Sequence, residues 1–211
     1  MGKSLERATT IAVGNSGIVL EGLYLGGRDD DDRGAVVAPP HPLYGGSMDS
    51  PVVNELNFAL HGSGIASLRF NWRGVGASGG DLTGDGQAAR ADYEAASLHM
   101  EETVAGPLVA AGYSFGAACA AAVASQRPRF QRLLLVAPPV QLLDPALFSG
   151  SVGDTLLISG ELDDYAPPAE LQRLCAGAQR VTLRIVPEAD HFFMRGLADI
   201  TREAQDWLQR V

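Results

Sequence analysis

The feature that most constrains this chain is the pentapeptide Gly112-Tyr113-Ser114-Phe115-Gly116, which fits the pattern G-x-S-x-G. An apolar segment of strand length, residues 107–112, precedes the serine, and a run of small helix-forming residues, 117–125, follows it. A strand that turns sharply into a helix through a serine is the context in which this pattern forms a nucleophile elbow. The sequence therefore predicts that Ser114 is presented at the end of a strand in an α/β fold.

The two glycines of this motif have a physical reason to be there. A serine on such a turn takes a strained backbone angle, and the neighbouring turns approach so closely that a Cβ atom would clash. A helix that starts at Phe115 points its free N–H groups and the positive end of its dipole toward charge developing beside Ser114. A plain Gly-Ser turn would leave the flanking strand and helix unexplained.

Length, charge and cysteine content limit what the chain can be. Its 211 residues suffice for one domain with a substantial core, which we expect to span residues 1–211. The formal net charge of −9 argues against nucleic acid or an anionic membrane as a partner, because both require a basic surface. Residues 1–7 lack the apolar stretch of a signal peptide, and Cys119 and Cys175 are not expected to pair. We therefore expect a cytoplasmic protein.

Strand-like and helix-like segments alternate along the chain. The expected strands are residues 9–13, 19–25, 35–38, 65–70, 107–112, 133–137, 155–159 and 181–186. The expected helices are residues 51–62, 87–104, 115–125, 169–175 and 194–210. The alternation predicts a doubly wound, mostly parallel sheet flanked by helices, with functional residues at the carboxyl ends of the strands. Ser50 is expected to cap the first helix, and the prolines of residues 39–46 to exclude regular structure there.

Two segments could be interpreted as ligand-binding motifs, but we consider it more consistent with the sequence that both are loops. Four consecutive aspartates, residues 29–32, lack the spacers and the glycine turn of a calcium loop, so a solvated loop is expected. Residues 74–79 contain G-x-G-x-x-G, but residues 80–86 intervene before any helix can start. A dinucleotide fingerprint opens a helix directly, so we expect a flexible loop at the carboxyl edge, and we expect no metal or cofactor.

Ser114 needs a general base and an acid that orients it, and in this kind of sheet these follow in the order Ser, Asp or Glu, His. His61 closes a helix and His99 lies within one, so both are expected to be solvated or capping residues. His191 follows the last expected strand on a loop at the carboxyl edge, and we predict that it is the base.

Three aspartates that follow strands are candidates for the acid. Asp163 lies in a G-x-x-D-x-x-x-P turn at the same edge as His191 and is the first choice, ahead of Asp164 and then Asp144. Asp190 adjoins the base in sequence, so its side chain is expected to make hydrogen bonds within the loop.

An oxyanion requires two backbone N–H donors. Phe115 would supply one, and the loop after residues 35–38 the other. Prolines at 39, 40 and 42 have no N–H, which leaves His41 and Leu43 as candidates. Leu43, Tyr44 and Tyr113 are the expected substrate contacts.

By these motifs the chain resembles the α/β-hydrolase superfamily over nearly its full length. The matching segments are Gly112–Gly116, Gly160-Glu-Leu-Asp163 and Ala189-Asp-His191-Phe-Phe. Residues 41–48 and 69–78 are similar to a small bacterial subgroup related to dienelactone-hydrolase-like and serine-aminopeptidase-like proteins. Dienelactone hydrolases use a cysteine nucleophile, so the serine at 114 argues against that activity.

The resemblance carries expectations about the site. His41 immediately follows the position where relatives carry a His-Gly pair, which favours its N–H over that of Leu43 as the second oxyanion donor. Larger relatives insert a helical lid where this chain has only residues 140–153, so an open site without a lid domain is expected. The implied activity is a serine hydrolase that cleaves a small-molecule ester or thioester through an acyl-enzyme. A peptidase or amidase of the same fold, or a non-catalytic binding module, is the alternative.

Overall fold

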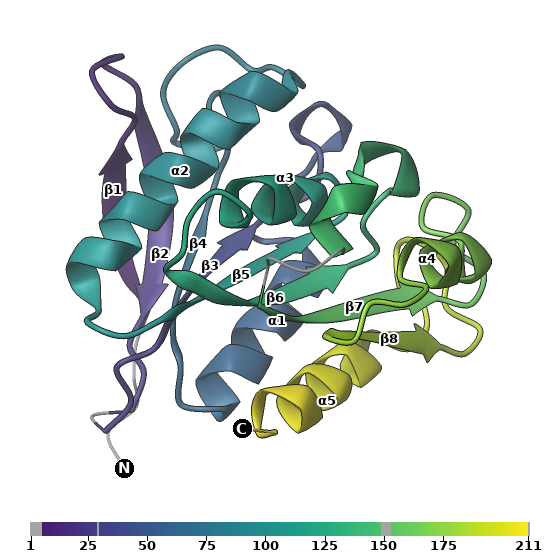
Figure 1. Cartoon of the computed structure of the whole chain (residues 1–211). Helices are drawn as coiled ribbons and strands as arrows, with labels where there is room; N and C mark the ends of the chain where they lie inside the picture. Colours follow the sequence, from purple (N-terminus) through teal and green to yellow (C-terminus); the bar gives the residue numbers. More distant parts are fainter. Residues whose placement is uncertain (1–5, 29, 149–152, 211) are drawn as a thin grey trace.

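The computed structural model describes residues 6–28, 30–148 and 153–210 (Figure 1). Within these residues one eight-stranded sheet runs in the order β1-β2-β4-β3-β5-β6-β7-β8. The strands are β1 (Arg7–Ala12), β2 (Val19–Leu25), β3 (Gly34–Ala38), β4 (Ala66–Phe70), β5 (Leu108–Tyr113), β6 (Phe130–Val136), β7 (Asp154–Gly160) and β8 (Val181–Val186). β2 pairs antiparallel with both β1 and β4, and every other pair of neighbouring strands in the sheet is parallel. The parallel strands bring the loops that follow them to one edge.

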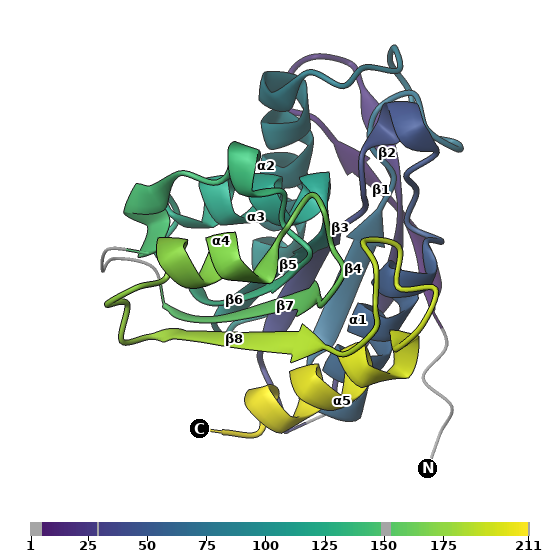
Figure 2. The same cartoon turned by 90° about the vertical axis from the view of Figure 1, so that its right-hand side faces the viewer.

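Helices cover both faces of this sheet. They are α1 (Pro51–Gly62), α2 (Gly86–Thr103), α3 (Phe115–Ala124), α4 (Pro168–Leu174) and α5 (Leu197–Leu208). Figure 2 shows α1 and α5 on one face and α2, α3 and α4 on the other. This is the doubly wound α/β arrangement that the sequence predicts, and every expected strand and helix lies within three residues of its observed bounds.

Two local expectations differ from the structure. The proline-rich segment after β3 was expected to be irregular, but Pro42–Tyr44 form one turn of 3₁₀ helix. Proline fits the first position of a helix, because its fixed φ suits the turn and its missing N–H would have no partner there. Ser50 occupies the N-cap position of α1 as expected, yet its side chain makes no capping hydrogen bond.

The connection between β6 and β7 leaves no room for a lid domain. It consists of residues 137–153 and contains two single turns of 3₁₀ helix, Val140–Leu142 and Pro145–Phe148, while residues 149–152 lie outside the described part. The expectation of a lidless fold is therefore confirmed. Separately, no helix among the described residues has both the length and the apolar character needed to cross a membrane.

The close packing of α3 against the sheet depends on small residues. α3 is built mainly of alanine and is almost entirely buried. A Cβ atom added to Gly116 would lie 2.3 Å from the Pro39 carbonyl oxygen and 2.7 Å from that of Ala38, well inside van der Waals contact. One added to Gly112 would lie 2.7 Å from backbone atoms of Gly116. The first turn of α3 therefore touches the carboxyl ends of both β3 and β5.

We expect Gly116→Ala to lower the free energy of unfolding by about 1–3 kcal/mol, because the added methyl group meets rigid backbone rather than a movable side chain. Gly86→Ala is the matched control: Gly86 also lies at the start of a helix, and a Cβ atom there meets nothing within 4 Å. Urea denaturation of both variants measures the difference. A Gly116→Ala protein as stable as Gly86→Ala would contradict the packing described for α3.

Candidate active site

Ser114 lies on a sharp turn between β5 and α3. Its backbone angles, φ 54° and ψ −123°, fall in a region that residues with a side chain rarely adopt. The turn is held in place because the Ser114 N–H donates to Val136 O at 2.9 Å, while the Ser114 carbonyl accepts the N–H of Ala117 at 3.0 Å. These bonds present the Ser114 hydroxyl at the carboxyl edge of the sheet, as the G-x-S-x-G pattern predicts.

His191 and Asp163 reach Ser114 from the loops after β8 and β7. In Figure 2 the arrowheads of both strands point toward the yellow loop that leads into α5. The Ser114 Oγ lies 2.9 Å from His191 Nε2, and His191 Nδ1 lies 3.0 Å and 2.9 Å from the two carboxylate oxygens of Asp163. All three residues are less than 10% exposed. The structure thus brings together the nucleophile, base and acid predicted from the sequence.

The carboxylate of Asp163 is oriented by the backbone of its own turn. Its Oδ1 accepts the N–H groups of Tyr165 and Ala166, each at 2.8 Å. Neither alternative acid is placed in this way. Asp164 is exposed, and Asp144 accepts the N–H of Ala146 in the connection between β6 and β7.

The loop that carries His191 is tied down at several points. Asp190 Oδ1 accepts the N–H of Phe192 at 3.1 Å and that of Met194 at 3.2 Å, which is the loop role expected for it. The Tyr113 hydroxyl donates to the His191 carbonyl at 2.8 Å. Tyr113 was expected to contact substrate, but it is only 5% exposed, and burial raises the pKa of its hydroxyl. It lies beneath the site and holds the loop that carries His191, a role that no local sequence signal indicates.

The loop after β3 brings His41 against the start of α3. The rings of His41 and Phe115 lie 4.7 Å apart between centroids. The Leu43 N–H donates to His41 Nδ1 at 3.3 Å, so it is already occupied. Within the described residues, the N–H groups of His41 and Phe115 donate to no protein acceptor. Of the two candidates for the second oxyanion donor, the geometry therefore favours His41.

The imidazole of His41 is partly buried and accepts a backbone hydrogen bond. Burial lowers its pKa, and its Nδ1 accepts a hydrogen bond, so the neutral ring with a proton on Nε2 fits the site. Gly84 packs directly over this ring, since a Cβ atom there would lie 2.6 Å from His41 Cε1. His41 thus forms part of the wall of the site.

Exposed apolar side chains flank the site on both sides. Leu43 and Tyr44 lie on the β3 side, where Tyr44 is 87% exposed. On the β7 and β8 side, the Tyr165 and Phe192 rings lie 4.7 Å and 5.5 Å from the His191 ring. Leu162 and Met194, on the same two loops, are also largely exposed. This apolar rim surrounds an open site.

The charges on the loops of this edge are mainly negative. Arg73 is paired with the buried Asp92, and Arg195 with Glu188. The carboxylates on these loops, besides Asp163, are Asp49, Asp81, Asp85, Asp144, Glu161, Asp164, Glu188 and Asp190. The site therefore lies in a negative field.

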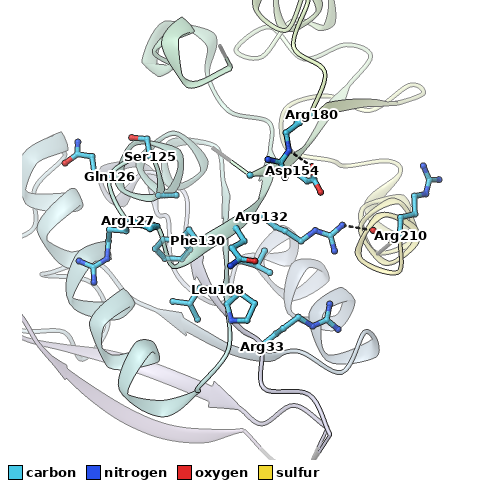
Figure 3. A pocket seen from close by; sticks show the side chains of 16 residues that line it. Arg33, Leu108, Ser125, Gln126, Arg127, Phe130, Arg132, Asp154, Arg180 and Arg210 are labelled. Carbon is cyan, nitrogen blue, oxygen red and sulfur yellow. Dashed lines mark hydrogen bonds and ion pairs between the residues drawn. The ribbon is translucent and has the colours of Figure 1, made fainter. Parts of the chain in front are cut away.

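A cavity of about 760 Å³ lies away from this site, at the amino ends of β5, β6 and β7 (Figure 3). Its arginine side chains point in different directions, and four of the five, all but that of Arg210, already have partners within the described residues, Arg127 through Glu101. Arg33 pairs with Asp31, Arg180 pairs with Asp154 at 2.9 Å, and Arg132 donates to carbonyl groups at the end of α5. These arginines do not converge on a common point where an anion could bind.

The structure also places the glycine-rich segment and the two cysteines. Residues 71–85 form a loop before α2 starts, so the glycine-rich segment does not open a helix. Within the described residues no group of three or more His, Cys, Asp or Glu side chains could hold a metal. Cys119 and Cys175 are both free, and burial raises the pKa of the Cys119 thiol to about 12. A protonated, buried thiol is a core side chain rather than a nucleophile.

Comparison with known proteins supports the same fold. The family model described as serine aminopeptidase, S33, matches residues 43–149. An uncharacterized protein of Rickettsia prowazekii is 28% identical over 199 residues, which cover 90% of this chain and 84% of that protein.

Solved structures extend the comparison over the whole chain. A Xanthomonas campestris protein, a member of the α/β serine hydrolases without a lid, is 29% identical with a TM-score of 0.85 and covers 100% of this chain and 96% of its own. An α/β serine hydrolase homologue from Coxiella burnetii is 27% identical with the same TM-score of 0.85, covering 99% of both chains. The chain belongs to the serine aminopeptidase S33 family of the α/β-hydrolase superfamily.

Proposed function

We propose that the chain is a serine hydrolase that cleaves an ester or thioester of a small molecule through an acyl-enzyme. One observation carries the proposal: an unbroken series of hydrogen bonds runs from Ser114 Oγ through both ring nitrogens of His191 to Asp163. A hydroxyl, an imidazole and a buried carboxylate in this order are the components of nucleophilic acyl transfer.

The reaction follows from this order. Ser114 Oγ attacks the carbonyl carbon while His191 Nε2 takes its proton, and Asp163 stabilises the imidazolium that forms. The negative charge on the carbonyl oxygen is received by the N–H groups of Phe115 and His41. The imidazolium returns the proton to the departing alcohol or thiol. Water then attacks the acyl-enzyme by the same steps, which releases the acid and restores Ser114.

The surroundings of the site favour an uncharged substrate with an apolar part. Tyr44 and Leu43 on one side, and Tyr165 and Phe192 on the other, offer apolar surface to the groups on either side of the scissile bond. The carboxylates on the same loops oppose the approach of a polyanion. We therefore favour neutral esters and thioesters over acyl groups carried by a phosphorylated thiol.

A peptidase is the second candidate, and two observations favour it. The matching family is described by an aminopeptidase activity, and the loop carboxylates, exposed Asp164 among them, could attract the α-ammonium group of a peptide. The rim side chains are largely exposed rather than enclosing, which suits a small ester better than a held peptide terminus, so an ester remains the preferred substrate.

Replacing the nucleophile tests the chemistry directly. We expect Ser114→Ala to lower kcat for an ester by about 10⁴–10⁶-fold and to abolish labelling by a fluorophosphonate. Ser125→Ala is the matched control, since Ser125 lies at the other end of α3 with its hydroxyl bonded to Ala122 O. A wild-type protein that resists the probe, or a Ser114→Ala protein that is still labelled at the same rate, would exclude the proposed nucleophile.

Two neighbouring aspartates allow a matched test of the acid. We expect Asp163→Asn to lower kcat by up to about 10⁴-fold, because an amide cannot hold the His191 tautomer that accepts the serine proton. Asp164→Asn should change kcat by less than about twofold, since its exposed side chain does not contact His191. Steady-state kinetics with one ester compares them. Equal losses, or a larger loss at 164, would show that the acid is assigned wrongly.

The charge of the leaving group tests the substrate class. We expect the coenzyme A thioester of a short acyl group to react at least about tenfold less efficiently, in kcat/KM, than the same acyl group on the neutral thiol N-acetylcysteamine. The gap should narrow in about 0.5 M NaCl, because salt screens the loop carboxylates. An aminoacyl p-nitroanilide provides the peptidase arm. A coenzyme A thioester that is the better substrate would contradict the charge argument, and an anilide that is hydrolysed fastest would favour the peptidase.

A further inference from the structure

The end of β4 and the two residues that follow it make hydrogen bonds to the loop that holds the second oxyanion donor. Arg69 Nη1 donates to the Met48 carbonyl at 2.8 Å, and Asn71 Oδ1 accepts the Met48 N–H at 2.8 Å. Trp72 Nε1 donates to Pro40 O at 3.0 Å and to Pro39 O at 3.2 Å. The R-F-N-W pattern singled out in the sequence therefore places three side chains on one loop, and the proposed reaction uses none of them.

The bond from Trp72 fixes the direction of one peptide group. A trans peptide directs its C=O and N–H to opposite sides, and the described residues contain no cis peptide bond. The carbonyl of the Pro40–His41 peptide faces Trp72, so its N–H, that of His41, faces away from the indole. The next carbonyl, that of His41, accepts the N–H groups of Tyr44 and Gly46, each at 3.1 Å. Hydrogen bonds therefore hold the carbonyl of this peptide group and that of the next one along the chain.

Burial and ring contacts hold the Trp72 indole, and with it the Nε1–H donor, in one position. Its side chain is 1% exposed, and its ring makes edge contacts with Phe70 and Phe115 at centroid distances of 4.9 Å and 5.9 Å. The contact with Phe115 links the indole to the residue that supplies the other oxyanion donor. A Cβ atom on Gly46 would lie 2.2 Å from Pro40 O, so the loop closes tightly over the same carbonyl.

We propose that Trp72 is a positioning residue for the oxyanion hole: its indole N–H holds the Pro40 carbonyl so that the His41 N–H is available beside Ser114. Without this bond the peptide can rotate, and a rotated peptide presents the Pro40 carbonyl oxygen to the developing negative charge. The inference rests on the proposed function, because it concerns a donor that is needed only while an oxyanion forms.

Trp72→Phe tests this role, since it keeps an aromatic ring in the core and removes the N–H. We expect kcat for an ester to fall by about 10–100-fold while KM changes by less than about twofold. The affinity for a boronic acid, which forms a tetrahedral adduct with Ser114, should fall by a similar factor. Trp207→Phe is the matched control: Trp207 is 6% exposed and packs on Arg132, away from this loop. It should leave kcat unchanged.

The outcomes separate this inference from the proposed function. Fluorophosphonate labelling of the wild type, lost in Ser114→Ala, establishes the hydrolase first. An unchanged kcat in Trp72→Phe then overturns the role of Trp72 alone, as does a loss of kcat matched by an equal rise in KM. If Trp72→Phe is poorly folded by thermal melting, benzothienylalanine at position 72 replaces it, because this analogue keeps the shape of tryptophan and lacks only the N–H. A fully active analogue enzyme would equally overturn the proposal.

Discussion

The close approach of the first turn of α3 to the ends of β3 and β5 is the constraint on which the site depends. Gly116 allows this helix to touch the backbone carbonyls of Ala38 and Pro39, and Gly112 allows β5 to pass beneath it. The contact leaves Ser114 on a turn too tight for ordinary backbone angles. It also brings the loop that follows β3 close to the turn that carries Ser114. One packing contact therefore supplies the serine hydroxyl, the Phe115 N–H and the position of His41.

Backbone strain gathers at the same edge of the sheet. Among the described residues, positive φ values at non-glycine positions occur at Ser114, Ala137, Glu188 and Phe193, all of which follow β5, β6 or β8. Hydrogen bonds hold these turns: the Ala137 N–H donates to Ile158 O at 2.7 Å, and the Phe193 N–H to Asp190 O at 3.2 Å. Strained turns persist where the surrounding structure over-determines them, and here the parallel strands provide that rigidity. The loops can therefore hold side chains at fixed distances from one another.

The sequence predicts those parts of the site that are encoded locally. Ser114 lies in a five-residue pattern, and Asp163 and His191 each follow a recognisable strand, so topology alone places them at one edge. Asp163 and Asp164 are harder to separate, because the choice depends on which carboxylate the turn directs inward. Tyr113 and Trp72 lie in motifs that the sequence analysis singles out, but the contacts they make could not be predicted from the sequence. Their partners, His191 O and Pro40 O, are distant in sequence. Every residue has a backbone carbonyl, so the sequence does not indicate which carbonyl accepts such a hydrogen bond.

In a site without a lid, the fixed direction of the His41 N–H matters for the proposed oxyanion hole. A closing lid removes water from a site and strengthens every hydrogen bond within it. Here the β6–β7 connection is too short for one, and the side chains of the rim are largely exposed, so no lid covers the proposed oxyanion donors. An open site must therefore rely on donors that already point in the required direction, because reorganising them during the reaction would add to the barrier. Hydrogen bonds to the carbonyls of Pro40 and His41 fix the direction of the His41 N–H before substrate arrives. The geometry of the first turn of α3 does the same for the Phe115 N–H.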